Sequence, residues 1–150
     1  MTELSHDCAQ ELLGSVLATM QSIRVEMRSQ RTPELTVPQF RTLVFLSKYK
    51  GAGLSDLAEH IGLSLPSMSK MIESLVGKGL VSRESCATDR RRVSLTLSPQ
   101  GEAIYRKASR SALDMLARKL EGLSAQDLEA LLPLLRELNS LFRPARDPRH

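Results

Sequence analysis

Apolar residues recur at helical spacing along most of this chain. Such a face runs through residues 8–30, where apolar side chains lie three, four or seven positions apart: Leu13, Val16, Leu17, Met20 and Met27. Similar spacing follows Thr36, spans residues 56–61 and 65–76, and occupies two long stretches that begin after Ser98 and Ser124. These patterns predict six helices, with loose segments at residues 1–7 and 143–150.

Residues typical of helix ends separate these segments. Pro33 ends the first helix, and Thr36 with Gln39 fits a capping box at the start of the second. Ser55 is the expected N-cap of the third helix, and Gly62 ends it.

Three more N-caps follow the same logic. Ser64 caps the fourth helix, Ser98 with Pro99 opens the fifth, which we expect to reach about residue 121, and Ser124 caps the sixth. Pro133 lies within the sixth helix and predicts a kink.

The spacing of apolar residues changes from helical to alternating between the fourth and fifth helices. Residues 80–85 and 93–97 read as two short strands, and the loop between them carries Asp89 and three arginines. A tight pair of helices followed by a hairpin is typical of a winged helix-turn-helix. We therefore expect a mostly α fold with a small antiparallel β-hairpin wing, flanked by dimerisation helices.

The helix pair at residues 54–80 carries the main functional signal. Its expected inner face is apolar: Leu57, Ala58, Ile61, Met68, Ile72 and Leu75. The outward side chains near the start of the second helix are short, polar or basic: Ser64, Pro66, Ser67, Ser69 and Lys70. Such a helix start suits the major groove, where side chains read base edges and free N–H groups meet a phosphate. An ordinary solvated polar face is the alternative explanation.

The hairpin supplies the second part of that signal. Arg90, Arg91 and Arg92 lie at its tip, and Arg83 lies in its first strand. Guanidinium groups beside a recognition helix suit phosphate contacts and a narrow minor groove. We expect Asp89 to pair with Arg91 and hold the loop, although an ordinary exposed ion pair is the simpler reading.

The composition of the chain further restricts the fold class and the kinds of partner that we expect. A length of 150 residues suits one domain, and an aromatic content of only 3% favours helices over an all-β core. The formal charge of +4 is compatible with a polyanionic partner. No run is long and apolar enough for a membrane span, and residues 1–10 do not read as a signal peptide, so we expect a cytoplasmic protein without membrane contact. Cys8 and Cys86 are isolated and are expected to be reduced thiols.

An enzyme is the first alternative class, and the sequence does not favour it. The three histidines, His6, His60 and His150, have no metal-ligand spacing. Phosphate loops, dinucleotide fingerprints and nucleophile elbows are also missing from the sequence. We expect no catalytic residues, no metal and no cofactor.

The helix pair and hairpin together resemble the MarR (multiple antibiotic resistance regulator) family. The resemblance runs through Leu57-Ala58, Gly62-Leu63-Ser64, Ser67–Lys70, Leu75, Lys78–Val81 and Arg83, and continues through Asp89–Arg91 and Val93–Gly101. It implies a homodimer in which the first, fifth and sixth helices of two chains interlock. It also implies a palindromic double-stranded operator, repression, and control by a small aromatic or phenolic effector. Cys86 beside the basic tip departs from the family pattern.

The expected division of the chain follows from this likeness. Residues 1–34 and 99–143 form the dimerisation region, residues 35–98 the winged helix-turn-helix, and residues 144–150 a basic tail. Two alternatives to a ligand-controlled regulator stay open: a redox sensor that acts through Cys8 or Cys86, and a winged-helix module that binds protein. Arg41, Tyr49 and His60 could approach an effector cleft, but ordinary surface roles are the simpler reading.

Overall fold

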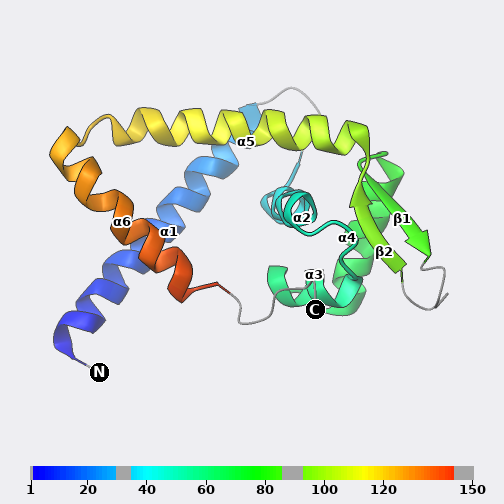
Figure 1. Cartoon of the computed structure of the whole chain (residues 1–150), viewed down its shortest axis with the longest axis horizontal. Coiled ribbons are helices and arrows are strands. Elements are labelled where there is room, and N and C mark those ends of the chain that lie inside the picture. The colour runs from blue at the N-terminus through cyan, green and yellow to red at the C-terminus, as the bar shows by residue number, and fades with distance from the viewer. Residues whose placement is uncertain (1, 30–34, 86–92, 144–150) are drawn as a thin grey trace. The chain divides into compact units, whose positions relative to one another are not determined.

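The computed structural model of the chain describes residues 2–29, 35–85 and 93–143. Within them the order is six helices with a hairpin after the fourth (Figure 1): α1 (Glu3–Ser29), α2 (Val37–Lys48), α3 (Leu54–Ile61), α4 (Leu65–Gly77), β1 (Val81–Ser85), β2 (Val93–Leu97), α5 (Pro99–Leu120) and α6 (Ala125–Leu141). This order confirms the predicted fold class. The chain divides into two compact units, residues 1–37 and 38–150, which are described separately.

Helix α1 forms most of the first unit and starts earlier than the sequence predicted. It begins at Glu3 rather than near Cys8, so the expected loose segment over residues 1–7 is wrong from Glu3 onward. The reason is a cap: the Ser5 N–H donates to Thr2 Oγ1 at 3.1 Å, and the Thr2 N–H donates to Ser5 Oγ at 3.0 Å. This reciprocal pair satisfies N–H groups that a helix start leaves free.

The core of the second unit joins α2, α3, α4 and the hairpin. Its fully buried apolar side chains come from each of these elements: Leu43, Leu46, Leu57, Met68, Ile72, Leu75, Leu80 and Leu95. Burying one such side chain stabilises the fold by about 1.5–3 kcal/mol before entropy is counted. Because three of the eight lie on α4, that helix is fixed along its inner side.

Helix α3 begins two residues earlier than expected. Gly53, not Ser55, is its N-cap, and the Gly53 N–H donates to the Asp56 carboxylate at 3.1 Å. Ser55 lies inside the helix. The acidic side chain at the third helical position performs the capping that the sequence reading assigned to a serine hydroxyl.

The hairpin matches the predicted strands and gains a third partner. Strands β1 and β2 pair antiparallel, with Val81 opposite Leu97 and Ser85 opposite Val93. Ala52, before α3, also bridges to Leu95: the Leu95 N–H donates to the Ala52 carbonyl at 3.0 Å, and the Gly51 N–H donates to the Leu95 carbonyl at 3.1 Å. This bridge attaches β2 to the segment that enters the helix-turn-helix.

The junction between the hairpin and α5 is tightly built. Ser98 caps α5 by accepting the Gly101 N–H at 2.9 Å, and its hydroxyl donates to the Gly79 carbonyl at 2.5 Å. Gly101 is buried directly against the Leu80 backbone, where a Cβ would overlap the carbonyl oxygen. The start of α5 is therefore fastened to the turn that follows α4.

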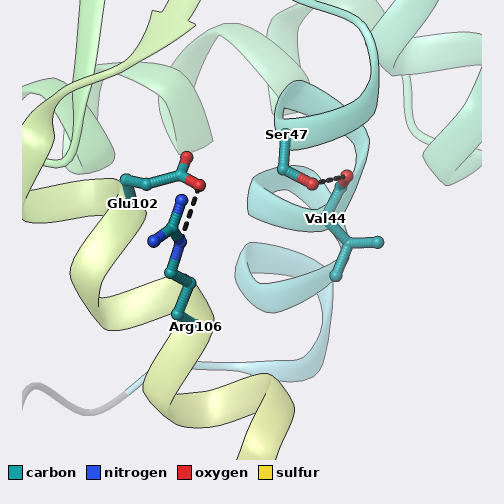
Figure 2. Close-up of polar contacts among 4 residues, drawn as sticks. All are labelled: Val44, Ser47, Glu102 and Arg106. Carbon is teal, nitrogen blue, oxygen red and sulfur yellow. Dashed lines mark hydrogen bonds and ion pairs between the residues drawn. The ribbon is translucent and has the colours of Figure 1, made fainter.

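Local hydrogen bonds of side chains occur in α2, α5 and α6. In α5, Arg106 Nε donates to Glu102 at 3.1 Å, while in α2 the Ser47 hydroxyl donates to the Val44 carbonyl at 2.7 Å (Figure 2). Ser124 caps α6 as predicted, accepting the Asp127 N–H at 3.1 Å. The helix continues through Pro133, and none of its residues is buried. The kink at Pro133 stays a prediction.

Candidate nucleic-acid interface

Helix α4 has one buried side and one exposed side. Met68, Ile72 and Leu75 are fully buried, so the opposite side of the helix faces solvent. Its start is capped as predicted: Ser64 accepts the Ser67 N–H at 3.3 Å and directs its hydroxyl to Ser67 Oγ at 3.0 Å. The cap leaves other N–H groups of the first turn without helical partners.

Four of the five residues predicted to read DNA from the start of α4 are exposed to solvent, and one is half-buried. Pro66, Ser67 and Lys70 are exposed on the side opposite the buried residues, and Ser64 is exposed at the cap. Ser69 is half-buried at the edge of that face. The exposed start of α4 thus offers one ring, two hydroxyls and one ammonium.

Two further residues share this exposed side and were missed. Glu73 and Ser74 are exposed, and Ser74 lies one helical turn beyond Lys70. Their positions in the apolar pattern of α4 would have located them, but the sequence reading stopped at Lys70. Among the residues that the structure describes, neither Lys70 nor Glu73 forms an ion pair.

The turn into α4 is held from two sides. Gly62 has a φ of 79°, a left-handed conformation that suits glycine, and its N–H and that of Leu63 both donate to the Ala58 carbonyl. Arg41 of α2 donates to the carbonyls of His60 and Ile61 at 3.3 and 3.5 Å. These bonds occupy carbonyls that the end of α3 would otherwise leave free.

An aromatic cluster lies beside this turn. The Phe45 ring lies 4.8 Å from Tyr49 and 4.6 Å from the His60 ring, measured between centroids. Partial burial, and then the positive charges of Arg41 and Lys48, lower the pKa of His60 below 6.5. Of the three residues named as possible cleft residues, Tyr49 and His60 therefore lie against Phe45, and Arg41 donates to the His60 carbonyl.

The wing is described only at its base. Arg83 is exposed on β1 and pairs across the hairpin with Leu95. The other predicted wing residues lie outside the described residues: Asp89, Arg90, Arg91, Arg92 and Cys86. Their roles stay predictions. Cys8, on α1, is exposed and is a free thiol.

The described residues offer neither a cluster of metal ligands nor a membrane-spanning helix. Across residues 2–29, 35–85 and 93–143, no group of three or more His, Cys, Asp or Glu side chains is placed to hold a metal ion. In the same ranges, no helix has both the length and the apolar character needed to cross a bilayer.

Comparison with known proteins identifies the region from α2 to the first residue of β2. The MarR family pattern matches residues 35–93. The winged helix-turn-helix of this chain is similar to that of the MarR family. MarR-family proteins are DNA-binding transcriptional regulators, and this region contains the exposed face of α4 described above.

Solved structures extend the likeness to nearly the whole chain. Rv1404 from Mycobacterium tuberculosis is 25% identical, with 97% of this chain and 99% of that one covered and a TM-score of 0.79. The transcriptional repressor CouR, solved on a 23-mer DNA duplex, is 27% identical over 92% of this chain and 96% of its own, with a TM-score of 0.72.

A third structure shares the fold. The MarR-family protein Rv2887 from Mycobacterium tuberculosis, in complex with p-aminosalicylic acid, is 22% identical over 87% of this chain and 97% of its own, with a TM-score of 0.73. The likeness in fold to these structures therefore includes helices outside residues 35–93.

Proposed function

We propose that this chain is a homodimeric, sequence-specific DNA-binding transcriptional regulator that represses by occupying a palindromic operator. The observation that carries the proposal is the exposed start of α4. One side of this helix is apolar and buried in the core, and the opposite side presents small polar side chains to solvent. The relation to CouR, which was solved on a DNA duplex, supports the same reading.

In this proposal α4 enters the major groove by its first two turns. Ser67 and Pro66 meet base edges, Ser64 and Ser69 flank them, and Lys70 binds a phosphate or a guanine. The small side chains allow the helix backbone to approach the bases closely.

The wing completes the proposed interface. Arg90, Arg91 and Arg92 contact phosphates or the minor groove, and Asp89 organises the loop. In the same proposal Arg83, which is exposed on β1, supplies one more positive charge.

Dimerisation is proposed from the apolar surfaces of the helices outside the winged region. Large apolar side chains of α6 and its C-cap are half or more exposed: Leu132, Leu134 and Leu141 in the helix, and Phe142 at the cap. On α1, Leu13 and Leu17 are about as exposed, at 60% and 59%. Such surfaces on a chain of 150 residues indicate a protein partner. A second copy is the partner that a palindromic operator requires, with half-sites roughly 34 Å apart.

Control by a small aromatic or phenolic effector is part of the proposal. Its support is the shared fold of Rv2887, which binds p-aminosalicylic acid. Oxidation of Cys8 or Cys86 is the alternative input. Loss of DNA binding on addition of a phenolic acid, retained when both cysteines are replaced by serine, favours the effector. Loss with peroxide, abolished by the same replacements, favours the redox alternative.

The proposed role of α4 is tested by replacing Lys70. On a duplex carrying the preferred site, Lys70→Met should weaken binding and reduce the slope of log affinity against log salt by about one if Lys70 neutralises a phosphate. Lys107→Met, an exposed lysine on α5, is the control and should change neither quantity. Equal affinities for Lys70→Met and the wild type would remove Lys70 from the interface.

A further inference from the structure

The end of α3 is held by a side chain from another helix. The last carbonyls of an α-helix have no partner within the helix. In α3 the Ala58 carbonyl accepts the two N–H groups of Gly62 and Leu63 at 2.9 and 3.0 Å. The carbonyls of the last two residues of the helix, His60 and Ile61, accept from Arg41.

The geometry suits a guanidinium. Nη1 of Arg41 reaches the Ile61 carbonyl at 3.5 Å and Nη2 reaches the His60 carbonyl at 3.3 Å, so one planar group joins two successive carbonyls. A lysine ammonium is a point charge without that fork. A positive charge at a helix C-terminus also interacts favourably with the helix dipole.

The contact lies immediately before the segment proposed to read DNA. Only three residues, 62–64, separate Ile61 from the first residue of α4. Any tilt or rotation at the end of α3 therefore passes into the first turn of α4, where hydrogen bonds to bases tolerate errors of only about 0.5 Å.

Helix α2 contacts both α3 and α4, the two helices of the helix-turn-helix. Beside Arg41, the buried Thr42 hydroxyl lies 2.8 Å from the Pro38 carbonyl and 3.3 Å from the Met71 sulfur of α4. Phe45, one turn further along, packs on His60 at 4.6 Å. Adjacent side chains of α2 thus contact both α3 and α4.

We propose that Arg41 is a positioning residue for DNA recognition: by clamping the end of α3 it fixes the angle at which α4 meets the major groove. The proposal rests on the proposed function. It assigns Arg41 no contact with DNA, so its removal should weaken binding without changing the number of phosphates neutralised.

The test uses three full-length variants on the preferred duplex. Arg41→Met keeps the apolar stem and removes the donors, Arg41→Lys keeps the charge without the fork, and Arg106→Met removes an exposed arginine of α5 as the control. Equilibrium binding is measured over a range of salt concentrations, and thermal unfolding shows that each variant is folded at the assay temperature.

The expected result is a five- to tenfold weaker affinity for Arg41→Met, about two- to threefold weaker for Arg41→Lys, and no change for Arg106→Met. The salt slope should equal that of the wild type in all of them. A slope reduced by about one in Arg41→Met would instead make Arg41 a phosphate contact and overturn the proposal. Unchanged affinity would also overturn it.

Two further outcomes also decide between the proposals. If Arg41→Met is unfolded at the assay temperature, Arg41→Lys decides, and wild-type affinity in that variant counts against the proposal. If the wild-type protein itself selects no site, the proposed function fails, which separates that failure from a failure of the Arg41 proposal.

Discussion

The close approach of α5 to the α4–β1 turn gives the sharpest prediction about stability. In Gly101→Ala the new methyl group would overlap the Leu80 carbonyl oxygen and lie 2.9 Å from its carbonyl carbon. Both obstacles are backbone atoms, so a side-chain rotation cannot relieve them. Overpacking of this kind costs about 1–3 kcal/mol, and the rigid obstacles place the cost near the upper end. The helix preference of alanine over glycine returns about 1 kcal/mol.

The net loss is therefore about 2 kcal/mol. For a chain of this length it corresponds to a fall in the unfolding midpoint of roughly 4–8 °C. The assay is thermal unfolding followed by circular dichroism, at equal protomer concentrations because the stability of a dimer depends on concentration. Gly77→Ala is the matched control, since Gly77 also lies in a helix and has nothing within 4 Å of its Cβ position. A midpoint for Gly101→Ala at or above that of Gly77→Ala would refute the packing argument.

Two more predictions concern the same unit. Ser98→Ala should cost about 1–2 kcal/mol and more than Ser124→Ala, because Ser98 donates to a distant turn besides capping its helix, whereas Ser124 bonds only within its own first turn; equal losses in urea unfolding would contradict this. The pKa of His60 is lowered in the folded state, so below pH 6.5 the unfolded chain binds the proton more readily. Stability should fall as the pH drops from about 6.5 through the lower folded pKa, and His60→Gln should flatten that part of the profile. A profile unchanged in His60→Gln, and flattened instead in His6→Gln, would refute the assignment.

Much of the fold could be predicted because strong periodic patterns and side-chain caps mark it. The serine caps at Ser64, Ser98 and Ser124 gave the starts of α4, α5 and α6, and alternation gave β2 to the residue. The sequence did not predict the Gly53 cap of α3, because glycine has no side chain that indicates an N-cap. Ser55, a common capping residue two positions later, was predicted instead, although the capping hydrogen bond joins the Gly53 N–H to Asp56.

Other features have no periodic signal. The Ala52 bridge involves a single residue, and its partner Leu95 is 43 positions later in the chain, so only the folded hairpin brings the two together. The Arg41 clamp spans about 20 positions for the same reason. On α4, the exposure of Glu73 and Ser74 did follow from the pattern, whereas the half-burial of Ser69 depends on how the neighbouring elements cover the edge of the helix.

The central claim is that this chain reads DNA as a dimer through the start of α4 and the wing. The most direct test is selection of binding sites by the full-length protein from random duplex DNA, followed by footprinting of the recovered sequence. The account predicts a pseudo-palindrome with two protected half-sites about one helical turn apart, bound with a steep salt dependence. Recovery of no common sequence, with only weak binding to any duplex, would contradict the account and favour a winged-helix module that binds protein.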